Sequence, residues 1–475
     1  MRRRFTLLAA TVTLAACSVG PQYKRPDLDV PASYRAQEAA PSAKSLADLA
    51  WWDVYQDKVL RQLLQTALQR NWDVQIAAAR VAEARAQVGV ARLGQLPQAD
   101  VGFSALRGRI FQGGSYVSGA LFGAQAQVSY ELDLWRRLAS LSEAARADLL
   151  ATEYARDSVR VGLVSDVATA YFDLLALDQQ LRITQRTVAT RERFLELTQS
   201  KFRQGASSGL DVSRAQASLA LVRASLPDFQ RQIEQKENQL RILLGQNPAP
   251  IAREPVDVQS VPAPPEVPAG LPSALLERRP DLRQAESALV GATAQVRATK
   301  AALFPSIALT SSFGAQSAQL SDLFSGPAKV WSFGLSLLQP LLDANRNGYQ
   351  VDAAQAREQQ ALLRYEQAVQ QAFGEVSDAL AARRGFGEFL RAQEEQVQAL
   401  REVSQRVLKR HEKGYSSYFE VVDADRDLFN AELQLVQAHR NTQVSVVQLY
   451  KALGGGWDSR VSDAATDGRH DAMGG

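Results

Sequence analysis

The sequence predicts an α+β membrane protein in which long helices alternate with pairs of amphipathic strands. Three observations support this prediction. The chain repeats one unit in tandem, its longest helical stretches carry apolar residues every seven positions, and four segments alternate apolar with polar residues. A heptad seam is typical of coiled coils, and a two-residue alternation is typical of strands with one apolar face.

The composition excludes several classes of protein. The 475 residues include 54 basic and 51 acidic side chains, and this net charge of +3 gives no electrostatic reason to expect nucleic-acid binding. One cysteine and three histidines exclude a Cys/His zinc site and a disulfide framework. We therefore predict no metal and no organic cofactor. Beyond residue 16, no apolar run approaches the roughly 18 residues of a membrane-spanning helix.

The N-terminus has the features of a bacterial export signal. Residues 2–4 are three arginines, and residues 5–16 form a short apolar segment. Residues 14–17, Leu-Ala-Ala-Cys, resemble a lipobox, which implies cleavage before Cys17 and an N-acyl and S-diacylglycerol lipid on it. The alternative is a plain signal peptide with a chance cysteine. Ser18 stands where inner-membrane lipoproteins carry Asp, so the resemblance favours the outer membrane.

One unit of about 208 residues occurs twice. A shift of about 208 positions places Asp73 on Asp281, and a shift of about 209 places Gly205 on Gly414. A period this long is not that of a solenoid, whose repeats have about 20–50 residues. The predicted divisions are a signal peptide (1–16), an anchored extended segment (17–56), repeat 1 (57–246), a proline-rich linker (247–272), repeat 2 (273–457) and a disordered tail (458–475).

Each repeat begins with a helical stretch and continues with a strand pair. The first helical stretches cover about 57–95 and 273–302, and each ends before a proline, Pro97 or Pro305. Glycine-rich loops are expected at 108–123 and 316–329. The alternating segments are 99–105, 124–134, 306–315 and 331–337.

Two long helices complete each repeat. They are expected at about 138–204 and 210–246, and again at 347–413 and 418–454. Sixty-seven helical residues would reach about 100 Å. Gly205 and Gly414 stand where helix C-caps need glycine. The heptad positions of the first helix are Leu174, Leu181, Val188, Leu195 and Phe202.

Neither the helices nor the strands can form a compact fold alone. Helices with one narrow seam need partner helices, and a four-stranded sheet has unpaired edges. In a membrane barrel the apolar face would contact lipid and the polar face would line water. Small barrels begin near eight strands, so several chains must contribute, and three would give twelve. The residues alone do not fix that number, and a soluble sheet covered by helices is the alternative.

An ordered set of short motifs resembles the TolC-like outer-membrane factor family, in its OprM- and NodT-type lipoprotein branch. No single motif is diagnostic, but together they run through nearly the whole chain after the signal peptide. The motifs occupy 17–26, 51–53 with Leu60 and Leu63, 71–74, 130–135, 277–283, 304–305, 339–340 and 450–457.

The resemblance implies a fold and a function. It implies a homotrimer with a twelve-stranded outer-membrane barrel, four strands from each chain, continued by a periplasmic α-helical coiled-coil barrel. It implies contact with outer-membrane lipid, a periplasmic adaptor (membrane fusion) protein and an inner-membrane pump. The chain would then be the passive exit duct of a tripartite multidrug efflux system of the RND type. The alternatives are a duct for type I protein secretion and a lipid-anchored periplasmic coiled-coil scaffold. No motif supports an enzyme.

The resemblance also implies a gate at the periplasmic tip, where the helical turns 205–210 and 414–418 should lie. Acidic side chains that form a ring around an axis repel one another and bind cations, while a ring of apolar side chains expels water. By alignment, Asp423 takes the acidic-ring position and Phe419 the apolar one. Glu420 matches Asp211 in the other repeat, whereas Asp423 matches an arginine. The alternatives are solvated charges on a helix face and, for Phe419, ordinary helix packing.

The same turns are the expected contacts for adaptor hairpins, since small residues permit close approach of helices. The alternative is a plain connecting turn. The candidate contact residues are Gly205, Ser207, Ser208, Leu210, Gly414, Ser416 and Ser417.

Overall fold

The computed structural model describes residues 19–35, 45–49, 51–54, 57–113, 115–254, 257–260, 270–339 and 344–455. The predicted signal peptide, Cys17 and the predicted tail at 458–475 lie outside these residues. The chain forms two compact units, and each takes segments from both sequence repeats. Of the described residues, the sheet unit takes those within Met1–Leu28, Ala79–Tyr154 and Arg283–Gln367. The helical unit takes those within Asp29–Ala78, Ala155–Leu282 and Ala368–Gly475.

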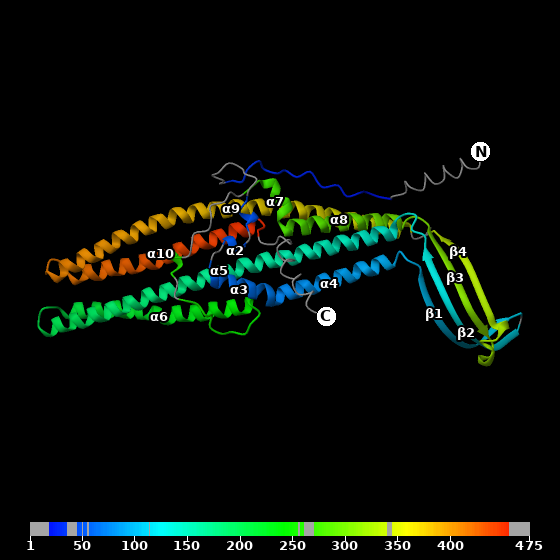
Figure 1. Cartoon of the computed structure of the whole chain (residues 1–475), viewed down its shortest axis with the longest axis horizontal. Coiled ribbons are helices and arrows are strands. Elements are labelled where there is room, and N and C mark those ends of the chain that lie inside the picture. Colours follow the sequence, from blue (N-terminus) through cyan, green and yellow to red (C-terminus); the bar gives the residue numbers. More distant parts are fainter. Residues whose placement is uncertain are drawn as a thin grey trace, which may run out of the picture. The chain divides into compact units, whose positions relative to one another are not determined.

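The sheet unit contains one antiparallel sheet that joins the strand pairs of both repeats. Its strands are β1 (Gln98–Gln112), β2 (Ser115–Glu131), β3 (Ser306–Ser317) and β4 (Lys329–Leu338). They lie in the order β1-β2-β3-β4, so the two hairpins meet where β2 pairs with β3 (Figure 1). The predicted four strands per chain are confirmed.

The prediction of a loop at 108–123 is wrong. Instead β1 and β2 continue to a tight turn, and their register remains unbroken from Gln98↔Ser129 to Gln112↔Ser115. Three glycines of this segment lie within the ladder, where Gly108 faces Gly119 and Gly123 faces Ser104. Glycine weakens a strand but leaves its backbone hydrogen bonds intact, so paired glycines do not end the ladder.

The connection between β3 and β4 does contain a loop. It includes two short 3-10 helices, η3 (Leu320–Asp322) and η4 (Gly326–Ala328). Leu323 and Ala328 of this loop are buried with Ala315 of β3.

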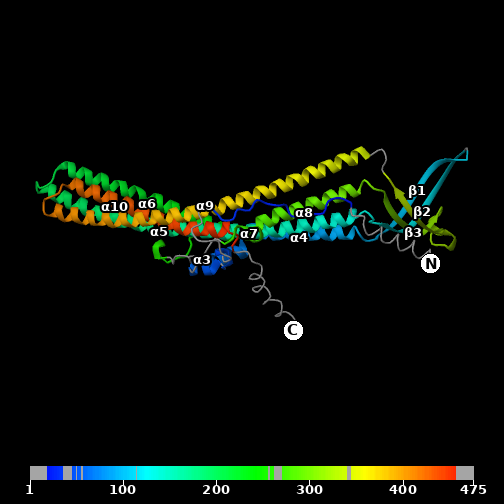
Figure 2. The same ribbon diagram turned by 90° about the horizontal axis from the view of Figure 1, so that it is seen from above.

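The long helices have nearly the predicted bounds. They are α5 (Arg137–Arg203), α6 (Gly209–Leu243), α9 (Ala344–Glu412) and α10 (Tyr418–Ala452). Figures 1 and 2 show α6 returning along α5, and α10 along α9, as two helical hairpins. No helix among the described residues has the length and apolarity needed to cross a membrane.

The shorter helical stretches are each broken once. The first divides into α3 (Lys58–Arg70) and α4 (Trp72–Leu93), and the second into α7 (Pro272–Arg278) and α8 (Pro280–Ala301). Asn71 makes the first break, because its side chain accepts from the N–H groups of Asp73 and Val74 while donating to the Leu243 carbonyl. Pro280 makes the second, because proline suits the first position of a helix but not its interior. The remaining short elements are η1 (Leu46–Asp48), α2 (Trp51–Val54) and η2 (Val258–Ser260).

The heptad seam of α5 is buried unevenly within one chain. Leu174 is 0% and Val188 9% exposed, but Phe202, near the end of the helix, is 49% exposed. Near the turn after α5, the described part of the chain thus leaves the seam half-exposed. Such an exposed seam is expected of a helix that packs against other copies of the chain.

In the predicted linker, residues 247–254 form no helix or strand, residues 258–260 form η2, and both parts are fastened to the helical unit. The Arg253 guanidinium contacts Asp178 of α5 at 2.5 and 2.8 Å and Glu237 of α6 at 2.5 Å. Arg182 of α5 pairs with Asp257 at 2.5 Å. These ion pairs hold the proline-rich segment against α5 and α6.

Candidate functional sites in the sheet and the helical turns

One face of the sheet is apolar across all four strands. The register places Phe103 opposite Ala124, Phe313 opposite Trp331, and Leu309 opposite Leu335. Phe103 is 77% and Trp331 78% exposed. Large apolar side chains exposed side by side mark a surface for protein or membrane contact, because water disfavours such a patch.

The opposite face of the sheet is polar. One row of this face runs through Asp100, Gln127, Ser312 and Ser332 on successive strands. The hydroxyls of Ser312 and Ser332 lie 2.8 Å apart and form a hydrogen bond. A sheet with one apolar and one polar face suits the wall of a water-filled barrel in lipid.

Trp135 anchors the junction between β2 and α5, a role that the sequence reasoning missed. Its indole N–H donates to the Pro305 carbonyl at 2.8 Å, and its ring stacks on Phe304 with centroids 4.9 Å apart. Arg137 pairs with Glu131 at 2.7 Å beside it. Trp135 and Pro305 are 170 positions apart. In the sequence, only their places in two of the family motifs, 130–135 and 304–305, connect them.

Glycines of positive φ form the two helical turns. Gly205 has φ +73° and Gly414 has φ +79°, and a Cβ at either position would meet nothing within 4 Å. Backbone conformation, rather than a close neighbour, therefore explains the glycines. The N–H of the residue after each glycine reaches back to the preceding helix, from Ala206 to Lys201 at 2.8 Å and from Tyr415 to Arg410 at 2.9 Å.

Matching capping boxes begin the returning helices. Ser208 and Asp211 exchange side-chain-to-backbone hydrogen bonds at the start of α6, and Ser417 and Glu420 do the same at α10. Ser207 donates a further bond to Asp211 at 3.2 Å. Bonds from Ser208 lower the pKa of Asp211, and bonds from Ser417 lower the pKa of Glu420. The two acids that align between the repeats are therefore helix caps in this chain.

The other two predicted gate residues carry different contacts. Asp423 pairs with Arg426 of the next turn at 2.5 Å, and both side chains are about half exposed. Phe419 is 53% exposed, and the guanidinium of Arg214 lies 5.2 Å from its ring centre. Arg214 is the repeat counterpart of Asp423, so α6 places a cation against the aromatic ring of α10.

The adaptor-turn candidates lie around these caps. Leu210 is 59% exposed. Arg410 donates to the Ser416 hydroxyl at 3.1 Å, and His411 contacts the Ser416 carbonyl at 3.0 Å. Side chains of α9 therefore hold the second turn in place, in addition to the backbone conformation that Gly414 allows.

Arg191 joins three helices of the helical unit. It is only 5% exposed, and it pairs with Asp425 of α10 and donates to the Ser218 carbonyl of α6, both at 2.8 Å. Its guanidinium also lies 5.7 Å from the Phe429 ring centre. Sequence reasoning did not find this residue, because 234 positions separate it from its carboxylate partner.

The chain matches a known family twice along its length. Residues 63–246 and 271–455 each match the family described as "Outer membrane efflux protein", which confirms the tandem repeat. The toluene efflux pump outer membrane protein TtgF of Pseudomonas putida is 36% identical over 482 residues, covering 98% of this chain and 99% of that protein. The cation efflux system protein CusC of Escherichia coli is 34% identical over 448 residues, covering 94% and 97%.

The fold is also that of a solved channel. The structure of the outer-membrane channel OprN superposes with a TM-score of 0.87 at 30% identity, covering 93% of this chain and all of that one. Similarity over nearly the full length of both chains includes the strands and the long helices.

Proposed function

We propose that three copies of this chain, which belongs to the outer membrane efflux protein family, form one continuous duct. The chain is an outer-membrane efflux channel that extends into the periplasm, and the family is not enzymatic. The single observation that carries the trimer is the two-faced sheet of four strands. Four strands cannot close a barrel, whereas three such sheets supply twelve.

The helices would form the tunnel that continues the barrel. The α5 seam, which is half-exposed at Phe202, gives each chain an unfilled surface for its neighbour. Sliding of whole helical hairpins against one another would widen or narrow such a tunnel without breaking hydrogen bonds inside the helices. The duct itself supplies no energy, and an inner-membrane pump would supply it through a periplasmic adaptor that packs on the turns at Gly205 and Gly414.

Asp423 and Phe419 would form the constriction of this tunnel. Three-fold symmetry turns each side chain into a ring, and a ring of carboxylates holds cations while a ring of phenyl groups expels water. The Asp423–Arg426 pair and the Arg214–Phe419 contact give each ring an adjacent cation. Asp211 and Glu420 would act less directly, by fixing the helix starts that carry the rings.

The names of the relatives favour small molecules, rather than proteins, as the cargo of the duct. TtgF is named for toluene and CusC for cations, and both names specify efflux rather than protein secretion. A wide water-lined duct discriminates weakly among small solutes, so the pump would choose the substrate. The family includes lipoproteins such as CusC, and we propose a lipid on Cys17 that fixes the N-terminus at the membrane.

Single-channel conductance in planar bilayers tests the gate. We expect Asp423→Asn and Phe419→Ala each to raise the open fraction or the conductance about twofold or more, because each removes one ring. Asp427→Asn is the matched control, since Asp427 contacts the same Arg426 at 3.0 Å from the next turn of α10. Unchanged conductance in both gate variants, or an equal rise in the control, would reject these residues as the constriction.

A further inference from the structure

The end of the sheet farthest from the helices carries a two-stranded extension. The pairing of β2 with β3 stops at Phe122↔Ser317, while the pairing of β1 with β2 continues to the turn. Residues 106–112 and 115–121 therefore form a ribbon beyond the four-stranded part, here called the rim ribbon. Helices lead into β1 and β3 and out of β2 and β4, so both hairpin turns lie at the end away from the helices. Because the channel extends into the periplasm through those helices, this end faces the outside.

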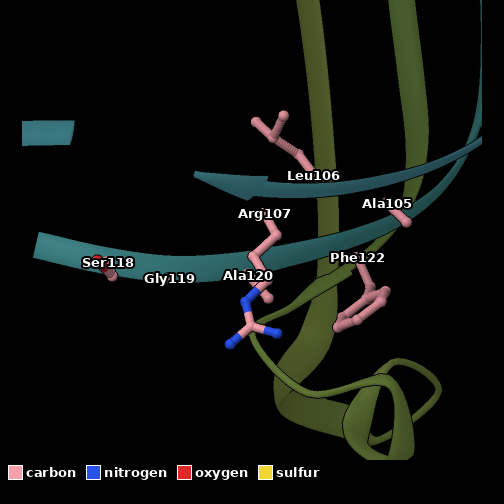
Figure 3. Close-up of a pocket in the computed structure, with 7 residues that line it drawn as sticks. All are labelled: Ala105, Leu106, Arg107, Ser118, Gly119, Ala120 and Phe122. Carbon is pink, nitrogen blue, oxygen red and sulfur yellow. The ribbon is translucent and has the colours of Figure 1, made fainter. Parts of the chain in front are cut away.

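The apolar face of the sheet becomes basic at the rim ribbon. Along β1 this face carries Val101, Phe103 and Ala105, and then Arg107 and Arg109. All five side chains are exposed. In Figure 3, Arg107 and Leu106 leave opposite faces of the strand. The two-residue alternation of β1 then places Arg107 and Arg109 on the face that carries Phe103 further down.

A third cation stands at the same end of the sheet. Lys329, at the start of β4, is exposed and lies opposite Ala315 on the apolar face. The β3–β4 loop adds two strongly exposed apolar side chains, Phe324 at 80% and Leu320 at 64%. The surface therefore passes from an apolar band to a border where apolar and cationic side chains mix.

Arg107 borders a shallow hollow of the rim. The hollow has a volume of about 310 Å³ and includes Arg107, Ala120 and Phe122 in its lining. Figure 3 shows the guanidinium extending past Ala120 on the side where the Phe122 ring lies. A guanidinium beside an aromatic ring can hold a phosphate with its planar donors while the ring contacts acyl carbon.

We propose that Arg107, with Arg109 and Lys329, binds the phosphate groups of phosphate-bearing glycolipid in the outer leaflet of the membrane. The order along the strand matches the order within such a lipid, with acyl chains against Phe103 and phosphate against Arg107. Basic residues beside an apolar membrane surface attract anionic headgroups in this way. The inference rests on the proposed barrel, because only a lipid-facing apolar face places these cations at headgroup level.

The test is a binding titration of the purified full-length protein with bisphosphorylated lipid A, followed by native mass spectrometry. We compare the wild type, R107Q/R109Q, and R85Q/R92Q, which removes two exposed arginines of α4 as a matched control. We expect about fivefold weaker binding for each rim arginine and about 30-fold for both, with the control unchanged. Lipid A stripped of its phosphates should bind the wild type at least as weakly as bisphosphorylated lipid A binds the double variant, which keeps Lys329.

The lipid-binding proposal is overturned if R107Q/R109Q binds like the wild type, if the control loses as much, or if the dephosphorylated lipid binds equally well. The same spectra report the oligomer mass. A species other than a trimer would contradict the duct proposal whatever the lipid result, so the two failures remain distinct.

Discussion

Arg191 shows how a single residue can stabilise the packing of several helices. It is nearly fully buried, yet it meets a carboxylate, a backbone carbonyl and an aromatic ring on two other helices. A buried cation is tolerated only when it is paired and hydrogen-bonded. Its contacts with α6 and α10 therefore fix how the helix ends that carry Asp211 and Phe419 pack against α5.

Replacement of Arg191 should loosen that packing. We expect Arg191→Met to lower the free energy of local opening of α10 by about 2 kcal/mol, because Asp425 loses its partner while still partly buried. Hydrogen exchange of the α10 amides measures this energy. Arg223→Met is the control, since Arg223 pairs with Glu192 at 2.5 Å but both are exposed, and it should cost less than about 1 kcal/mol. Equal losses in the two variants would show that burial of the pair is irrelevant.

The capping acids should make the helix starts sensitive to acid. The pKa values of Asp211 and Glu420 are lowered from the ordinary 3.8 and 4.5. Their caps therefore add stability at pH values above about 4.5, and this stability is lost as the pH falls through the lowered values. We expect exchange protection of the first-turn amides of α6 and α10 to fall progressively as the pH is lowered below about 5, after correction for intrinsic exchange.

Asp211→Asn is the control for that titration, because asparagine can accept the same hydrogen bonds without titrating. The α6 protection of this variant should stay level over the same range while that of α10 still falls. A parallel fall of α6 protection in the variant and the wild type would place the acid sensitivity elsewhere.

At the scale of elements, the sequence predicted the long helices and the sheet faces well. Helix bounds agree within a few residues, because the heptad pattern and the C-cap glycines at 205 and 414 indicate the same boundaries. The strand alternation correctly separated Phe313 and Trp331 from Ser312 and Ser332. Local pattern was sufficient because each of these features depends on near neighbours in sequence.

Features that depend on distant partners were missed. Gly108 and Gly119 suggested a loop, but each faces the other in the ladder, a pairing that local composition does not reveal. The break at Asn71 depends on the Leu243 carbonyl, 172 positions away. For the candidate gate, alignment placed Phe419 and Asp423 on one helix, but the roles of Asp211 and Glu420 as caps emerged only from their hydrogen bonds.

A paired substitution tests which sheet face meets lipid. Phe333→Arg places a charge on the apolar face, and Ser332→Arg places the same charge on the polar face one residue away. We expect the first to lower the stability of the membrane-inserted sheet by about 2–4 kcal/mol and the second to have little effect on it. Heat-modifiable migration of the oligomer in gels, with quantified outer-membrane levels, measures the difference. Greater damage from Ser332→Arg would reverse the assignment of the faces.

At the scale of the whole molecule, each chain is an incomplete object. Its sheet exposes large apolar residues on one face, and among the residues that the structure describes its two edges, at β1 and β4, are unpaired. The heptad seam of α5 is half-exposed at Phe202, near the end of that helix. A closed ring of copies would cover both surfaces, because β4 of one chain would pair with β1 of the next and the helix seams would pack against neighbouring chains. Membrane anchoring, channel formation and gating would then all depend on that assembly.

The oligomer mass of the protein, purified from membranes in mild detergent, tests this central claim most directly. Mass photometry or native mass spectrometry of the full-length chain, with negative-stain images of the same particles, supplies the measurement. We predict three copies of a 51.9 kDa chain, less the removed signal peptide, in tubular particles with one barrel end. A monomer or dimer that stays soluble once its lipid is removed would contradict the account, because four strands from each chain could not then close a barrel.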